Sequence, residues 1–200
     1  MEGLLRYVLP AYLLIYFSTA FFWRSYKVWK TTGINPFVLS NTDSAHDFIG
    51  KVFKLFFALI VVVVLVYSVS GKLYQYLLPI AWLELPGIII VGLILLLLSL
   101  VWTLLAQSQM GKSWRIGIDT KHKTELVRDG VFRFSRNPIF LGMMITLLGL
   151  FLIIPNALTL LILVLGVVLI QIQVRLEEEH LRMIHGELYL DYCRDVHRWL

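Results

Sequence analysis

Charged residues are scarce in this chain: Lys and Arg number 18, and Asp and Glu number 13, which is 16% of 200 residues. Soluble domains average about 25% charged residues, so this composition, with 58% hydrophobic residues, excludes an ordinary soluble domain. We therefore expect one integral membrane domain over residues 1–200. The net charge of +5 is typical of loops beside anionic headgroups, so we expect membrane lipids, and no nucleic acid, as partners.

Common catalytic and metal-binding patterns are also missing. Cys193 is the single cysteine, which excludes an intrachain disulfide. His180 and His185 are five residues apart, so they lie on different faces of a helix, and no cluster of ligands accompanies them. We therefore expect no metal. The sequence contains no phosphate-binding or dinucleotide-binding glycine pattern and no Ser-His-Asp arrangement.

Five apolar stretches are candidates for membrane-spanning helices, each of which needs about 20 apolar residues. They are Leu4–Trp23, Val52–Ser70, Leu85–Ala106, Ile139–Ile154 and Ala157–Val174. Only Pro155-Asn156 separates the last two, and these residues favour a turn, so we predict a tight helical hairpin with slightly short arms. The expected fold is an all-α integral membrane protein with about five transmembrane helices. Three spans lie in residues 1–106, and the hairpin and an amphipathic C-terminal segment lie in residues 107–200.

Basic residues gather after the first span, after the third span and in the C-terminal tail. They are Arg24, Lys27, Lys30, Lys51, Lys112, Arg115, Lys121, Lys123, Arg128, Arg133, Arg136, Arg175, Arg182, Arg194 and Arg198. The other side of the membrane would hold only Arg6 and Lys72. By the positive-inside rule, the N-terminus is expected outside and the C-terminus in the cytoplasm. We interpret the first apolar stretch as a retained span, not as a cleaved signal peptide.

Two polar clusters flank the hairpin on the same membrane face. At its start, Pro138 suits the first turn of a helix, Asn137 is a candidate cap, and the free N–H groups there can bind an anion. Gly142, one turn later, would let a flat ligand approach the backbone. The alternative is a capped helix start with Arg136 reaching toward the headgroups.

The second cluster is the run from Arg175 to Leu181, which contains three adjacent carboxylates. Glu178 shares a helix face with Arg175 and with Arg182. A carboxylate at the membrane boundary can stabilise a bound cation, and the alternative is the solvated start of an amphipathic tail helix. Apolar helices need neither cluster to span a bilayer, so the pair indicates a functional site.

These residues form an extended pattern. Arg-Asn-Pro-x-Phe-x-Gly begins at Arg136, and a Glu pair at Glu177 is followed by Gly186, Tyr189, Tyr192 and Arg198. The pattern resembles the isoprenylcysteine carboxyl methyltransferase family in its bacterial branch, which is related to the membrane phospholipid methyltransferases. The resemblance is strong over Gly111–Trp199. It implies a multi-pass enzyme of a prokaryotic inner membrane that uses S-adenosylmethionine.

The resemblance also implies site residues. Those expected to bind the cofactor are Arg136, Asn137, Pro138, Phe140, Gly142, Glu178, Tyr189 and Tyr192, with Arg194 as a second candidate for clamping its carboxylate. Arg175 and Glu178 are expected to be catalytic. The acceptor is expected to be a lipophilic small molecule or a lipid that enters from the bilayer.

The acceptor itself has three candidates: a prenyl-thioether carboxylate, a phospholipid amine or a small lipophilic thiol. The chain departs from the family at Asn137, where His is frequent, at Phe140, where Tyr is frequent, and at His185, where Phe is frequent. Gln173 occupies the position of an Arg that holds the acceptor carboxylate in prenylcysteine enzymes, so it disfavours the first candidate. From another class, a non-catalytic membrane scaffold or a transporter remains an alternative, although the charge-free spans disfavour a transporter.

Overall fold

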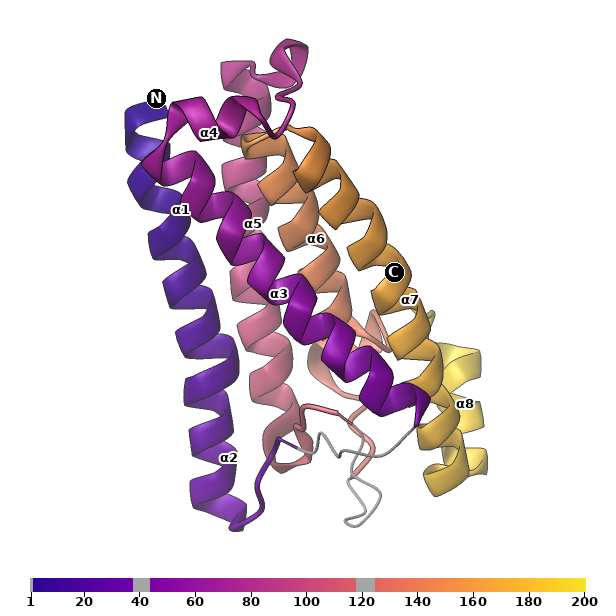
Figure 1. Ribbon diagram of the computed structural model, residues 1–200. Helices are drawn as coiled ribbons and strands as arrows, with labels where there is room; N and C mark the ends of the chain where they lie inside the picture. Colours follow the sequence, from indigo (N-terminus) through magenta and orange to yellow (C-terminus); the bar gives the residue numbers. More distant parts are fainter. Residues whose placement is uncertain (1, 38–43, 118–124) are drawn as a thin grey trace.

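The computed structural model describes residues 2–37, 44–117 and 125–200, and within these ranges it is mainly helical, without a β-strand (Figure 1). The elements are α1 (Glu2–Phe17), the π-helix η1 (Ser18–Trp23), α2 (Arg24–Thr32), α3 (Ala45–Val69), α4 (Gly71–Gln75), the 3-10 turn η2 (Ala81–Leu83), α5 (Pro86–Met110), the 3-10 turns η3 (Gly111–Ser113) and η4 (Gly130–Arg133), α6 (Pro138–Ile153), α7 (Ala157–His185) and α8 (Glu187–Asp195). The predicted all-α class is confirmed. Lys121 and Lys123, two of the basic residues counted above, lie outside the described residues.

Four helical segments are long and apolar enough to cross a membrane: Glu2–Thr32, Ala45–Val69, Pro86–Ser113 and Ala157–His185. The fifth, α6, has 16 residues, or about 24 Å at 1.5 Å per residue, which is shorter than a hydrocarbon core of about 30 Å. All five lie side by side in one bundle (Figure 1). A multi-span bundle is therefore observed, and the number of complete crossings stays a prediction.

Two of the helices extend beyond the predicted spans. The first continues past Trp23 to Thr32, and Gly33 then ends it in the left-handed conformation at φ 70°. The second begins at Ala45 and not at Val52, because the Ser44 side chain caps it by accepting a 3.2 Å hydrogen bond from the Asp47 N–H. Hydropathy located the apolar centres of these helices, and the capping residues set their ends.

The hairpin between α6 and α7 turns where it was predicted, at Pro155-Asn156. Asn156 Oδ1 accepts a 2.9 Å bond from the Thr159 N–H, and Thr159 Oγ1 accepts a 3.1 Å bond from the Asn156 N–H. This reciprocal capping box starts α7 directly after the turn. The segment before η2 covers the turn, since the Ile80 N–H donates to the Pro155 carbonyl at 2.9 Å.

Small residues bring α5 and α6 into backbone contact. A Cβ atom on Gly149 would lie 2.9 Å from the Gly92 carbonyl oxygen, and one on Gly92 would lie 2.8 Å from the Gly149 oxygen. Gly92 therefore permits the close packing of α5 on α6, whereas Gly87 has no atom within 4 Å of such a Cβ. The apolar core runs between the helices and includes Leu5 on α1 and Ile170 on α7.

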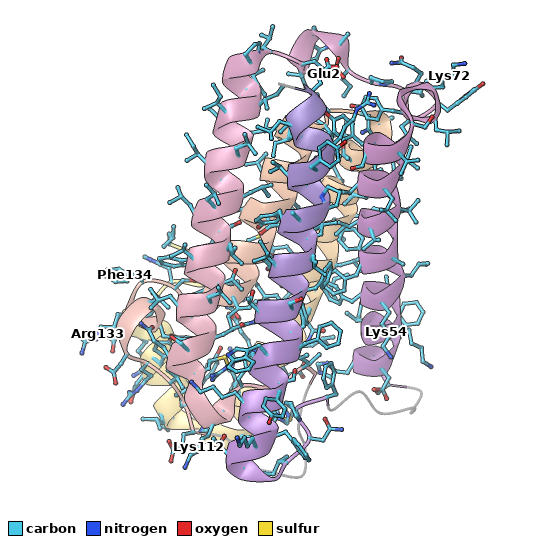
Figure 2. The ribbon with its side chains drawn as sticks, turned by 90° about the vertical axis from the view of Figure 1, so that its left-hand side faces the viewer. Glu2, Lys54, Lys72, Lys112, Arg133 and Phe134 are labelled. Carbon is cyan, nitrogen blue, oxygen red and sulfur yellow. The ribbon has the colours of Figure 1, made fainter. Side chains whose placement is uncertain are left out.

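The two ends of the bundle differ in charge. Figure 2 shows Glu2 and Lys72 at one end, and Lys54, Lys112 and Arg133 at the other. We call the second the basic end. It also holds α8, which lies beside the last turns of α7 (Figure 1). The residues with candidate functions therefore gather at this end.

Candidate active site

Glu178 is the centre of a buried cluster at the basic end. It lies in the last third of α7 and is 6% exposed. Its Oε1 accepts hydrogen bonds from Arg136 Nη2 at 3.3 Å, Asn137 Nδ2 at 3.0 Å and Arg198 Nε at 3.1 Å. Its Oε2 accepts from Arg198 Nε at 3.1 Å and Nη2 at 2.7 Å. One carboxylate thus joins the start of α6, the end of α7 and the C-terminal tail.

Arg136 holds the tail against the start of α6. Its Nη1 donates to the carbonyl oxygens of Cys193 at 3.1 Å and Val196 at 2.9 Å, and its backbone N–H donates to the His197 oxygen at 3.0 Å. The side chain is 11% exposed. The predicted meeting of Arg136 and Glu178 is therefore observed, and backbone contacts of the tail reinforce it.

Arg198 was part of the sequence pattern but was not among the predicted site residues. It forms a bidentate ion pair with Glu178, and these hydrogen bonds raise the pKa of the Arg198 guanidinium above its usual value. The guanidinium stays charged and offsets the Glu178 carboxylate. Its place at the end of the pattern, after Tyr189 and Tyr192, was the available signal.

Tyr189 and Tyr192 form the inner face of α8, with exposures of 1% and 4%. Tyr192 donates a 2.6 Å hydrogen bond to the Phe132 carbonyl, which fastens α8 to η4. Burial raises the pKa of both phenols, and the nearby Glu178 carboxylate adds to this rise for Tyr189. Both side chains therefore remain neutral at physiological pH.

Asn137, Pro138, Phe140 and Gly142 lie at the start of α6, where they make contacts within the protein, and their binding of a cofactor stays a prediction. Asn137 does not cap the helix with its side chain, and that prediction is wrong, because the amide turns to Glu178 instead. The Pro138 carbonyl oxygen accepts a 2.8 Å hydrogen bond from Trp102 Nε1. Phe140 packs against the apolar core. Thr103 and Trp102 of α5 fill the space beside Gly142, so the absence of a side chain there allows α5 to pack closely against α6.

Two predicted site residues lie outside the cluster. Arg175 is exposed, and its Nη1 donates to the backbone and side-chain oxygens of Gln171 at 2.7 and 2.8 Å. Arg194 is 71% exposed and pairs with Asp191 at 2.7 Å. Neither binds Glu178, because Arg175 binds Gln171 and Arg194 binds Asp191 instead. The geometry supports Arg136 over Arg194 as the buried guanidinium of the site.

One donor in the cluster is unused. Arg136 Nε is buried and has no hydrogen-bond partner. A buried donor without an acceptor is costly, by about 1–3 kcal/mol, and more when it is charged. The cluster can therefore accept one more oxygen ligand, and a carboxylate suits a guanidinium.

Comparison with protein families matches residues 88–188, about half of the chain, to the phospholipid methyltransferase family. The chain belongs to this family and is a membrane methyltransferase. The match covers α5, α6 and α7 and includes Arg136, Asn137 and Glu178. A comparison with curated proteins finds no match. The predicted relationship to the isoprenylcysteine and phospholipid methyltransferases is therefore confirmed at the level of the family.

Proposed function

We propose that the protein transfers the methyl group of S-adenosylmethionine to a lipophilic acceptor at the Glu178 cluster. The observation that carries the proposal is the junction of Arg136, Asn137, Glu178 and Arg198, with the unused Arg136 Nε inside it. Membership of a methyltransferase family supplies the reaction type.

The residues present fit this cofactor. Its amino-acid part carries a carboxylate, which suits the unused Nε of Arg136. When bound, the cofactor supplies an electrophilic methyl group on a positively charged sulfur. The chain's own residues bind and orient it, and their burial keeps water from competing with the acceptor.

The environment of Gln173 favours an amine or thiol acceptor over a carboxylate. Gln173 is buried on α7, and its Nε2 donates a 2.8 Å hydrogen bond to Glu177 Oε1. Glu177 has no cationic partner within the described residues. The site therefore offers no cation to an acceptor carboxylate, whereas an ammonium can donate a hydrogen bond to the Glu177 carboxyl. Of the three candidate acceptors, a phospholipid amine therefore fits best, ahead of a small thiol and a prenylcysteine carboxylate.

The basic end supports an orientation. Lys54, Lys112 and Arg133 lie at this end, so the positive-inside rule favours the cytoplasm for this end and for the C-terminus. The methyl donor then arrives from the cytoplasm and the acceptor from the inner leaflet. A prokaryotic inner membrane remains the expected location.

Titration of the purified protein in detergent with S-adenosylhomocysteine tests this function. We expect saturable binding, and transfer of a labelled methyl group to phosphatidylethanolamine in a panel that includes a prenylcysteine and a lipophilic thiol. Binding with transfer only to the prenylcysteine would keep the enzyme class and overturn the acceptor. A folded protein that binds no S-adenosylhomocysteine would favour the non-catalytic scaffold.

A further inference from the structure

A second polar site lies at the basic end, between the first helix and α5. The π-helix η1 ends at Trp23, and Arg24 follows directly. Gln107 Nε2 donates to the Ala20 carbonyl at 3.0 Å, and Arg24 Nη2 donates to the Gly111 carbonyl at 2.5 Å. These two contacts are one helical turn, or about 6 Å, apart on both helices. They tie the two helices together at one level of the bundle.

Two polar atoms at this level have no partner. Arg24 is 9% exposed and Gln107 is 3% exposed, yet Arg24 Nε and Gln107 Oε1 are both buried without a hydrogen bond. Native proteins rarely leave such atoms unsatisfied, and a charged one is the most costly. A group that offers an acceptor to Arg24 and a donor to Gln107 would satisfy both atoms. π-Helical turns such as η1 are frequent at functional sites.

Among the residues that the structure describes, none balances the charge of Arg24. The sequence has no Asp or Glu between Glu2 and Asp43, and none between Glu84 and Asp119. Both segments that form the site carry only cations at the basic end: Arg24, Lys27, Lys30, Lys112 and Arg115. In the part of the chain that the structure describes, no carboxylate pairs with Arg24. The Gly111 carbonyl at the C-terminal end of α5 gives Arg24 only the partial negative charge of a helix terminus.

The position of the site identifies the class of ligand. Arg24 follows the apolar part of a helix that is long enough to span the membrane. Exposed aromatic side chains surround this level: Trp23 at 64%, Tyr26 at 48% and Trp29 at 54%. Such residues mark the zone of lipid headgroups. A phosphate there accepts from a guanidinium, and a headgroup hydroxyl can donate to the Gln107 oxygen.

We propose that Arg24 and Gln107 form a binding site for the phosphate and headgroup of an anionic phospholipid with a hydroxyl-bearing headgroup. The lipid neutralises Arg24 and fastens the first helix to α5. Arg24 lies outside the residues matched to the family and Gln107 lies inside them, and the site contains no residue of the Glu178 cluster. It therefore stands independently of methyl transfer.

Thermal unfolding of delipidated protein in neutral detergent tests the proposal. Phosphatidylglycerol is expected to raise the melting temperature saturably by about 5 °C, because a ligand that binds only the folded state stabilises it. Phosphatidylcholine and inorganic phosphate are expected to have little effect. Arg24→Gln should lose most of the rise. Lys27→Gln, which removes a charge at an exposed position of the same helix, should keep it.

Each other outcome overturns the proposal. An equal rise with inorganic phosphate would identify a free ion as the ligand, and an equal rise with phosphatidylcholine would show no selectivity for charge. No rise with any lipid would mean that trapped water satisfies the two atoms. If Arg24→Gln does not fold, Gln107→Met removes the unsatisfied oxygen without placing a charge against the Ala20 carbonyl. That variant should fold and respond less to phosphatidylglycerol, and a wild-type response would contradict the site.

Discussion

Replacement of Glu178 by alanine should destabilise the protein much more than loss of an ordinary surface charge. The carboxylate accepts hydrogen bonds from Arg136, Asn137 and Arg198 while only 6% exposed. Without it, two guanidinium groups face each other with no counter-charge. The structure therefore predicts a loss of stability together with release of the C-terminal tail.

The magnitude follows from the exposure of the two arginines. Removing one partner of a buried ion pair costs about 3–5 kcal/mol. The Arg198 side chain is 34% exposed and can regain water, whereas Arg136 is 11% exposed and keeps its bonds to the tail carbonyls. We therefore expect the lower end of the range, about 3 kcal/mol.

Equilibrium unfolding in detergent, with limited carboxypeptidase digestion, measures both effects. Glu178→Ala should unfold at lower denaturant and lose residues beyond Asp195 faster than wild type. Glu179→Ala is the matched control, because Glu179 is the exposed next residue and its loss should stay within about 0.5 kcal/mol. Equal stability of the two variants would refute the assignment of Glu178 as the residue that joins the three segments.

Two further predictions concern packing and pH. Gly149→Ala should destabilise the protein by about 1–3 kcal/mol, because the new Cβ would clash with the Gly92 carbonyl oxygen. Gly87→Ala is the control and should not destabilise it, because a Cβ there meets no atom within 4 Å. Thermal unfolding of the two variants compares these effects. Stability should hold up to about pH 10 and fall above it. Because the folded protein raises the pKa of Tyr189 and Tyr192, these phenols ionise at lower pH in the unfolded chain than in the folded one. Their contribution to the stability of the fold is therefore complete below about pH 10 and is lost above it. A pH series with Tyr192→Phe, which should decline less steeply, checks this; identical profiles would contradict it.

Local chemistry made much of the fold predictable. Pro155 and Asn156 carry their own turn and capping preferences, and the uncharged runs beside them can lie only in an apolar layer. The meeting of Arg136 and Glu178 followed from this one turn, because it places both ends of the hairpin at the same face. Such features depend on residues close in sequence or on composition.

The remaining details depend on partners distant in sequence. Arg175 shares a helix face with Glu178 by spacing, but Gln171 binds it and the tail supplies Arg198 instead. Spacing along one helix cannot reveal which segment packs against it. The same holds for Gly142, whose missing side chain accommodates α5, and for Arg24, whose burial depends on the end of that helix.

The most direct test of the central claim is the affinity for S-adenosylhomocysteine of two matched arginine variants. Arg136 and Arg194 were both predicted to clamp the cofactor carboxylate, and the structure buries only the first. The account predicts that Arg136→Gln, with its fold verified by circular dichroism, weakens binding by about 100-fold, as expected for loss of a charge-assisted contact of roughly 3 kcal/mol. Arg194→Gln should bind like wild type. Unchanged affinity in a folded Arg136→Gln variant would contradict the placement of the cofactor at the Glu178 cluster.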